Sequence, residues 1–282
     1  MTRILLTGAT GFVGRQILNH LLNQNFQVRV VMRSREEMPP ETEQVIIHDL
    51  FSADFNSLCE LCYDIDIIIH AAWYAVPGKY LHADDNIACL VGTLRFAQAS
   101  IKAGVPRFVG VGTCFEYDLS DGYLRTNTPL DPQTLYGACK ASTFISLSKL
   151  MDCEKRSFAW CRLFYMYGEG EHKDRLIPYI RRQLSAGEVA NLTSGKQIRD
   201  YLDVNVAGRQ IVDAAIGYFN GPLNICSGIP ITVAELACKI ADEYGRRDLL
   251  AFGVKSDTNT DPVCVFGEPS FTRSCNIVRS VE

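Results

Sequence analysis

The sequence lacks a strong excess of either charge. Its 282 residues include 28 Lys and Arg against 32 Asp and Glu, for a formal net charge of -4. This balance attracts neither nucleic acid nor an anionic membrane, so an anionic substrate would need a local basic site. No apolar run is long enough to span a bilayer, and no signal peptide precedes the apolar segment at residues 3–6. We therefore expect a cytoplasmic protein that binds neither nucleic acid nor membrane.

Metal-binding patterns of cysteine and histidine are also missing. The 11 cysteines are scattered, and although Cys59 and Cys62 have CxxC spacing, no second pair accompanies them. We expect no metal site, and we expect most cysteines to be small apolar core residues in a reducing cytosol. The chain has no internal repeat, and its 47% apolar content is that of an ordinary globular protein.

Short apolar runs alternate with helical patterns through the first half of the chain. The runs at 4–6, 28–32, 45–47, 65–69 and 108–111 predict buried parallel strands. Helical patterns include 13–23, 86–103 and 135–151, and a sixth strand is predicted at 159–164. This alternation predicts an α/β fold with a doubly wound, Rossmann-type parallel sheet, which we assign to residues 1–165.

The second half, residues 166–282, has a looser pattern. Helices are predicted at 175–186, 204–218 and 232–244, with short strands at 199–203 and 223–226. Thr232 and Glu235 have the spacing of a capping box at the start of the last helix. Residues 258–282 show little periodicity. We expect a smaller α/β substrate-binding region that is partly interleaved with the first domain.

A glycine-rich loop follows the first predicted strand. Gly8, Gly11 and Gly14 have the spacing that permits a tight turn, close approach of a pyrophosphate, and packing of the next helix on the sheet. The helix start also supplies N–H donors and the positive end of a dipole. The sequence therefore predicts a dinucleotide site, whose expected contacts here are Gly8, Thr10, Gly11, Phe12, Val13 and Gly14. The alternative is a tight turn that binds no ligand.

Two arginines follow the second predicted strand, where NAD enzymes usually carry an acidic residue. Arg33 and Arg35 could pair with the 2′-phosphate of NADP, because guanidinium matches the geometry of phosphate. The alternative is that both are solvated loop charges. The sequence thus favours NADP(H) as the cofactor and leaves NAD(H) possible.

Three residues form a candidate catalytic set. Tyr136 and Lys140 are four residues apart in a predicted helix and therefore share one face. A tyrosine hydroxyl has a pKa of about 10, and a nearby ammonium together with a positive nicotinamide would favour its anion. Lys140 could also hold the nicotinamide ribose. Thr113, at the end of the fifth predicted strand, could polarise a carbonyl, although a structural turn threonine is the plainer alternative.

Together these motifs resemble the extended short-chain dehydrogenase/reductase superfamily, in its nucleotide-sugar epimerase/dehydratase/reductase branch, over residues 3–245. The resemblance implies cofactor contacts at Asp49, Leu50, Ala71 and Ala72, and a mainly structural Asn86. It implies that Arg199 grips a nucleotide diphosphate, with Lys255 or Arg273 as a second cation. Tyr165 stands where the family usually has a substrate-contacting Asn. The resemblance further implies a homodimer built on helices 86–103 and 135–151.

The departures from the family pattern narrow the chemistry. Sugar dehydratases carry an Asp-Glu pair directly after the catalytic Thr, but this chain has Cys114 and Phe115 there. Neither side chain can act as that acid/base pair, so dehydration is not expected. The resemblance then implies reduction of a 4-keto group on a nucleotide-activated 6-deoxyhexose. The alternatives are a 4-epimerase with tightly bound NAD and a non-enzymatic cofactor sensor, which the intact catalytic set disfavours.

Overall fold

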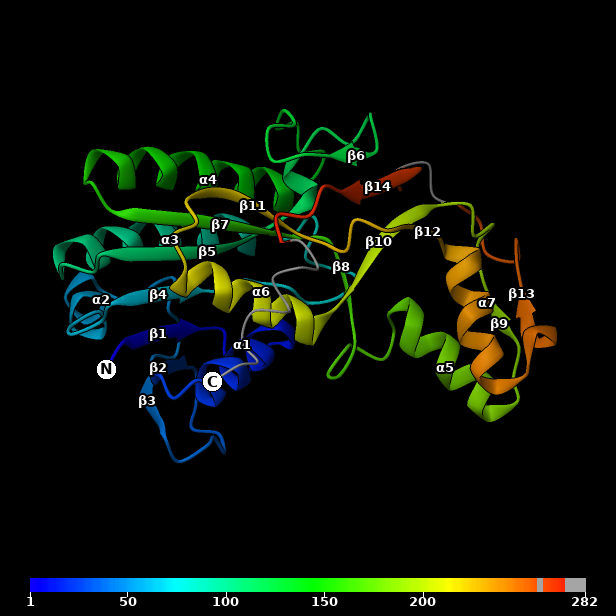
Figure 1. The fold of residues 1–282 in the computed structure, drawn as a ribbon, viewed down its shortest axis with the longest axis horizontal. Helices are drawn as coiled ribbons and strands as arrows, with labels where there is room; N and C mark the ends of the chain where they lie inside the picture. The colour runs from blue at the N-terminus through cyan, green and yellow to red at the C-terminus, as the bar shows by residue number, and fades with distance from the viewer. Residues whose placement is uncertain (258–260, 272–282) are drawn as a thin grey trace, which may run out of the picture.

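The computed structural model describes residues 1–257 and 261–271, and its centre is a seven-stranded parallel sheet (Figure 1). In spatial order the strands are β11 (Gly221–Ile225), β7 (Ser157–Leu163), β5 (Arg107–Thr113), β4 (Ile67–His70), β1 (Arg3–Thr7), β2 (Gln27–Met32) and β3 (Thr42–Ile46). The chain therefore runs outward in opposite directions from β1 and β4. The predicted doubly wound α/β class is confirmed. In such a sheet, ligands bind outside the carboxyl ends of the strands where the order reverses.

Helices cover both faces of this sheet (Figure 1). One face carries α1 (Phe12–Asn23) and α6 (Val204–Ile216), and the other carries α2 (Phe55–Leu61), α3 (Asp85–Lys102) and α4 (Leu135–Cys153). Because both faces are covered, the inner strands have no solvent side, whereas the edge strand β3 is largely exposed. This explains why β4 consists of three isoleucines and a histidine that are all buried.

The sequence placed the sheet correctly but missed some boundaries and elements. The third strand covers Thr42–Ile46 and not 45–47, and the fourth covers Ile67–His70 and not 65–69. The short helix α2 lacks a long periodic pattern and was not predicted. In addition, α6 and β11 return from the second half of the chain to the central sheet. The division between residues 165 and 166 stays a prediction.

The rest of the second half forms a smaller lobe, at the right of Figure 1. Here α5 (Leu176–Ala186) and α7 (Val233–Tyr244) share a small apolar core. The paired strands β9 (Ala190–Asn191) and β13 (Leu250–Ala251) lie beside these helices. A second small sheet joins the lobe to the end of the central sheet, and its strands are β12 (Pro230–Thr232), β10 (Ile198–Asp203), β14 (Cys264–Gly267), β6 (Tyr123–Leu124) and β8 (Tyr165–Tyr167). The predicted capping box of Thr232 and Glu235 at the start of α7 is confirmed. Arg273 lies outside the described residues.

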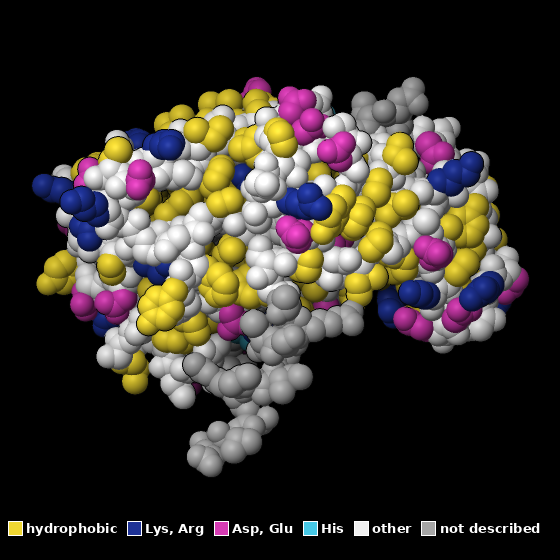
Figure 2. All heavy atoms as spheres, turned by 45° about the horizontal axis from the view of Figure 1, so that its top comes forward, with side chains coloured by type: hydrophobic (Ala, Val, Ile, Leu, Met, Phe, Trp, Pro, Cys, Tyr) yellow, Lys and Arg dark blue, Asp and Glu magenta, His cyan; other side chains and the backbone are white. Residues whose placement is uncertain are grey.

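The surface combines charged ends with a more apolar middle. In Figure 2 the charged side chains of both signs gather toward the two ends of the molecule, and apolar side chains lie along the face between them. No helix in the described part of the chain is long and apolar enough to cross a membrane. Within residues 1–257 and 261–271, no group of three or more His, Cys, Asp or Glu side chains is placed to hold a metal ion.

Candidate active site

The glycine loop lies at the point where the strand order reverses. Gly8 has a φ of 74°, and a Cβ built on it would lie 2.7 Å from the backbone nitrogen of Ala72. A Cβ on Gly14 would lie 1.9 Å from the carbonyl oxygen of Gly8. Only glycine fits at these two positions. Gly11 is the N-cap of α1 and provides no side-chain cap, so the N–H donors of this helix end remain for an anion.

Buried polar contacts fix the adjacent end of β4. The two ring nitrogens of His70 hydrogen-bond to the hydroxyls of Thr7 and Thr93, at 2.8 and 3.0 Å. Burial, with Lys140 adding to it, lowers the pKa of His70 to about 3, so the ring is neutral. The Thr7 hydroxyl also accepts from the backbone N–H of Ala72 at 3.2 Å. The predicted contacts Ala71 and Ala72 therefore lie directly beside the glycine loop.

The end of β2 presents the two predicted arginines to solvent. Arg33 and Arg35 are both exposed, and the backbone carbonyl of Arg33 hydrogen-bonds to His48. Nearby, Asp49 accepts from the Ser52 hydroxyl at 2.6 Å and from the Phe51 N–H at 3.0 Å, which lowers its pKa. Leu50 is buried.

Thr113 and Tyr136 come together where β5 and α4 meet. A short 3-10 turn, Cys114–Glu116, follows β5, and a Cβ on Gly137 would lie 2.4 Å from the Phe115 carbonyl oxygen of that turn. Thr134 caps α4 by accepting from the Gly137 N–H at 3.1 Å. The start of α4 thus packs against the turn, and the Tyr136 side chain lies close enough to the Thr113 hydroxyl for that hydroxyl to lower the pKa of Tyr136.

The titration of Tyr136 differs from the sequence-based expectation. Burial raises the pKa of its phenol above the ordinary value, and Tyr80 adds to this while Thr113 opposes it. The reason lies in the position of Lys140, whose ammonium donates to the Val111 carbonyl at 2.6 Å and lies 3.8 Å from the centroid of the Trp73 ring. Burial also lowers the pKa of Lys140 to about 7. In this state Tyr136 is a protonated acid at neutral pH.

Aromatic side chains that the sequence analysis did not single out enclose Tyr136. The rings of Tyr80 and Trp73 lie 4.9 and 6.5 Å from it, both edge-to-face. Asn86 accepts from the Trp73 indole at 2.8 Å and donates to the Tyr80 carbonyl at 2.6 Å, which supports its expected structural role. Aromatic residues in an irregular loop give no periodic signal, so only the tertiary contacts reveal them.

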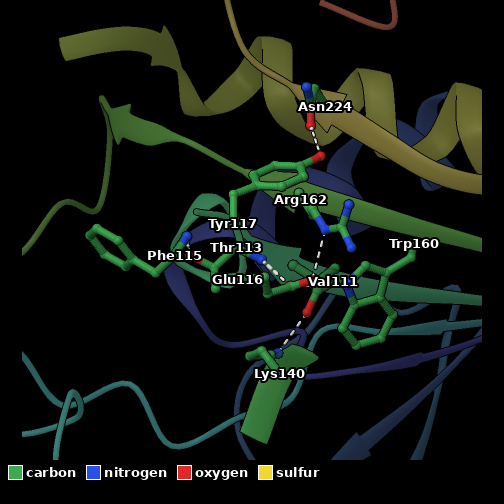
Figure 3. A network of polar contacts seen from close by, with 9 residues as sticks. All are labelled: Val111, Thr113, Phe115, Glu116, Tyr117, Lys140, Trp160, Arg162 and Asn224. Atoms are coloured by element: carbon green, nitrogen blue, oxygen red, sulfur yellow. Dashed lines mark hydrogen bonds and ion pairs between the residues drawn. The ribbon is translucent and has the colours of Figure 1, made fainter. Parts of the chain in front are cut away.

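A buried carboxylate lies behind Thr113, directly after the positions that lack the dehydratase pair. Figure 3 shows the Glu116 carboxylate directed toward Trp160 and Arg162, with Lys140 reaching Val111 beside it. Glu116 is 0% exposed and forms an ion pair with Arg162 at 2.7 Å. Both of its oxygens are engaged by the protein interior, so it does not replace the missing acid/base pair.

The predicted substrate residues do not all meet. Arg199 in β10 lies 5.2 Å above the ring of Tyr165 in β8, which places these two together. Arg199 is 3% exposed and pairs with Asp261 at 2.6 Å. Lys255 is elsewhere, because its ammonium lies 4.3 Å from the ring of Tyr179 in α5.

Arg175 is a further cation that the sequence did not point to. It is the uncapped N-cap residue of α5 and forms a long ion pair, 3.7 Å, with Glu171. It lowers the pKa of both Tyr80 and Tyr201, although burial raises both overall. The charge of Arg175 therefore acts both on Tyr80, which contacts Tyr136, and on Tyr201, which lies near Arg199.

A family model described as "NAD dependent epimerase/dehydratase family" matches residues 4–213. The chain belongs to this family. The match spans the glycine loop, the catalytic set and Arg199, so family membership and site geometry involve the same residues. The predicted recognition of nucleotide-sugar enzymes of the extended short-chain type is confirmed.

Several curated relatives align over most of the chain. A dTDP-6-deoxy-L-talose 4-dehydrogenase (NAD(+)) from Aggregatibacter actinomycetemcomitans is 23% identical, with 94% of this chain and 98% of that protein covered. A CDP-abequose synthase from Salmonella muenchen is 25% identical, with coverages of 72% and 66%. An uncharacterized UDP-glucose epimerase from Bacillus subtilis is 27% identical, with coverages of 96% and 88%. Relatives named as a dehydrogenase, a synthase and an epimerase therefore have similar sequence identity to this chain.

Solved structures of family members share the fold. MoeE5 in complex with UDP-glucuronic acid and NAD has a TM-score of 0.81 and 25% identity, with 95% of this chain and 90% of that chain covered. UDP-glucose 4-epimerase from Thermotoga maritima has a TM-score of 0.84 and 20% identity, with the same coverages. These relatives carry NAD or a UDP-sugar in their structures, and the fold they share with this chain includes the reversal point between β1 and β4.

Proposed function

We propose that this enzyme uses NADP(H) or NAD(H) to reduce the 4-keto group of a nucleotide-activated 6-deoxyhexose. The observation that carries the proposal is the closeness of the Thr113 and Tyr136 side chains, with Lys140 one helical turn from Tyr136 and the Glu116 carboxylate of the adjoining turn directed into the core. This set can polarise and protonate a carbonyl, and it lacks a free acid/base pair for removing water. The names of the 4-dehydrogenase and abequose synthase relatives agree with it.

The chain offers a fitting cradle for the cofactor. The spaces that a Cβ would fill at Gly8 and Gly14, together with the uncapped start of α1, suit a pyrophosphate. Thr10, Phe12, Val13, Asp49, Leu50, Ala71 and Ala72 would line the rest, with Lys140 at the nicotinamide ribose. The exposed Arg33 and Arg35 favour a 2′-phosphate, so we propose a preference for NADP(H).

Three side chains take part in the proposed reaction: the hydroxyls of Thr113 and Tyr136, and the ammonium of Lys140. When bound, the cofactor supplies the hydride. The Thr113 hydroxyl donates a hydrogen bond to the keto oxygen, and Tyr136, which is protonated at neutral pH, gives its proton to that oxygen. Lys140, whose ammonium donates to the Val111 carbonyl, would hold the nicotinamide ribose.

Substrate binding is proposed at Arg199 and Tyr165. Arg199 is the cation that would hold the diphosphate, and it would exchange the Asp261 carboxylate for phosphate oxygens. Binding energy from this remote group would position the sugar ring for reaction. Lys255 lies on another element, and the proposal does not depend on it.

The homodimer of the sequence analysis also remains a proposal, and the helices expected to form it carry exposed apolar side chains. Ile87 and Val91 in α3 and Ile145 in α4 are about half exposed, at 47%, 52% and 52%. Two helices from each subunit could bury these side chains in a four-helix contact.

The test is oxidation of NADPH and NADH with dTDP-, CDP- and GDP-4-keto-6-deoxyhexoses, with Tyr136→Phe as the matched control. We expect turnover with one of these substrates, and a loss of about a hundredfold or more in kcat for the variant. No turnover with any of the three, in protein shown to bind cofactor, would refute the proposal. Interconversion of sugars without net cofactor change, with NAD retained through purification, would instead establish the epimerase.

A further inference from the structure

Glu116 is a fully buried carboxylate that the reaction proposed above does not use. Its Oε1 accepts from the Thr113 N–H at 2.8 Å and from the Trp160 indole at 2.9 Å. Its Oε2 accepts from Arg162 Nε at 2.7 Å. Both oxygens therefore have fixed partners, and one of these partners is the backbone of the residue that carries the candidate catalytic hydroxyl.

The strand beside Glu116 is shaped to admit it. A Cβ on Gly112 would lie 2.4 Å from Glu116 Oε1 and 2.2 Å from Trp160 Nε1, and a Cβ on Gly110 would lie 2.3 Å from the Trp160 ring. Any larger residue at either position would displace the indole or the carboxylate. The two glycines of β5 thus provide the space in which the carboxylate meets Trp160 and Arg162.

The end of β5 is held from two sides by opposite charges (Figure 3). The Lys140 ammonium binds the Val111 carbonyl, and the Glu116 carboxylate binds the Thr113 N–H two residues later. Arg162 balances the carboxylate, is only 1% exposed, and lies 4.4 and 4.5 Å from the rings of Tyr117 and Phe144. Low polarity around these groups strengthens their electrostatic interactions.

Glu116 is the carboxyl group that interacts with Lys140. The other titratable groups that interact with Lys140 are Cys89 in α3 and His70 in β4. Burial raises the pKa of Cys89 to about 11 and lowers that of His70 to about 3, so both are neutral near pH 7. Tyr136, on the same helix as Lys140, is also neutral there. Burial lowers the pKa of Lys140, and the Glu116 carboxylate opposes that effect.

We propose that Glu116 is a positioning residue, which orients the Thr113 turn through its backbone amide and supplies the buried negative charge that interacts with Lys140. This inference rests on the proposed function, because it takes Thr113 and Lys140 as the groups through which Glu116 acts. The plainer alternative is that Glu116 and Arg162 only stabilise the fold. The two roles are separable because the charge on Lys140 can be measured without any substrate.

The experiment replaces the pair by neutral amides. Glu116→Gln alone leaves the buried Arg162 charge unpaired and is expected to destabilise the fold, so the working variant is Glu116→Gln with Arg162→Gln. The control is Arg29→Gln with Glu43→Gln, an ion pair between β2 and β3 on the opposite half of the sheet. Lysine labelled with 13C at Cε gives the titration of Lys140, whose signal is assigned by its loss in Lys140→Met.

We expect the Lys140 midpoint to fall by about one pH unit or more in the double variant and to stay in place in the control. In the reductase assay, kcat should fall by about tenfold or more while KM for the sugar changes little. The alkaline limb of the kcat profile should move to lower pH, because Lys140 then loses its proton earlier.

An unmoved Lys140 midpoint with unchanged kcat in the folded double variant would overturn the proposal. If that variant does not fold, Glu116→Asp decides, because it keeps the charge and withdraws the carboxylate by one methylene. It should keep the Lys140 midpoint and lower kcat, and wild-type kcat there would refute the orienting role. A shifted midpoint in protein that reduces none of the sugars would refute the proposed function alone.

Discussion

Substitution of Gly14 by alanine tests whether close backbone approach at the start of α1 creates the cofactor site. The new Cβ would lie 1.9 Å from the Gly8 carbonyl oxygen and 2.7 Å from the Gly8 carbonyl carbon. Non-bonded heavy atoms settle at about 3.5 Å, so α1 and the loop must separate by roughly 1.5 Å. All the atoms in this clash belong to the backbone, and no side-chain rotation can relieve it.

That displacement should weaken cofactor binding as well as lower stability. A shift of this size removes at least one N–H···phosphate hydrogen bond, and each such charged bond contributes about 1.5–3 kcal/mol. The dissociation constant for NADPH or NADH should therefore rise about tenfold to a hundredfold. Overpacking of this kind should also lower the free energy of unfolding by about 1–3 kcal/mol, partly offset by the better helix propensity of alanine.

Gly104→Ala is the matched control. Gly104 has a φ of 86°, but a Cβ there would have no heavy atom within 4 Å. The residue lies before β5, at the amino ends of the strands, whereas the site lies at their carboxyl ends. This variant carries only the strain of a left-handed backbone, about 1–2 kcal/mol, and should bind cofactor normally. Calorimetric titration and denaturant unfolding separate the two effects. Equal cofactor affinity in the two variants would refute the reasoning.

Three further predictions concern charge and assembly. Burial lowers the pKa of Lys140 from 10.5 to about 7, so between these pH values the unfolded chain binds a proton that the folded chain lacks. Lys140→Met should therefore raise the free energy of unfolding at pH 7 by on the order of a few kcal/mol, and this gain should vanish toward pH 10.5 in denaturant titrations. A gain that stays constant with pH would contradict this. Arg33→Ala and Arg35→Ala should each weaken NADPH binding by about tenfold and leave NADH binding unchanged, and equal effects on both cofactors would show that the two arginines do not bind the 2′-phosphate. Val91→Glu and Ile145→Glu should convert a dimer to the 31.4 kDa monomer in light scattering, whereas a monomeric wild type would refute the interface.

The fold could be predicted from the sequence, and the candidate catalytic set proposed from it, because their signals are local. Buried parallel strands appear as continuous apolar runs, and Tyr136 and Lys140 are one helical turn apart. The glycine loop likewise needs only the strand before it and the helix after it. Each of these features lies within about one βαβ unit, so no long-range pairing had to be inferred.

The smaller lobe was harder because most of its strands have only two to four residues and pair across large sequence distances. β13 pairs with β9, about sixty residues earlier, and β14 pairs with both β10 and β6. Segments this short show no alternation of apolar and polar residues. Lys255 was paired with Arg199 only through the family resemblance, and the structure places its ammonium beside the ring of Tyr179.

Glu116 escaped notice for a different reason, since a single carboxylate in a turn is ordinarily solvated. What places it inside is the pairing of β5 with β7, which sets Gly112 opposite Arg162. The sequence did contain a signal, because glycines at 110 and 112 leave one face of a central strand without side chains. Such a gap must be filled by a large neighbour, and here Trp160 and the Glu116 carboxylate fill it.

The position of Glu116 also changes the argument against dehydration. From the sequence, that argument rested on the identity of Cys114 and Phe115. The Glu116 carboxylate, one residue further along, could have taken the place of the missing acid/base pair. In the structure both oxygens of this carboxylate bind Thr113, Trp160 and Arg162 on the core side of the turn. Turning it toward the substrate would leave a buried guanidinium and a buried indole N–H without partners, which is costly. The proposal that this enzyme does not eliminate water therefore depends on the direction of Glu116 as much as on the residues that precede it.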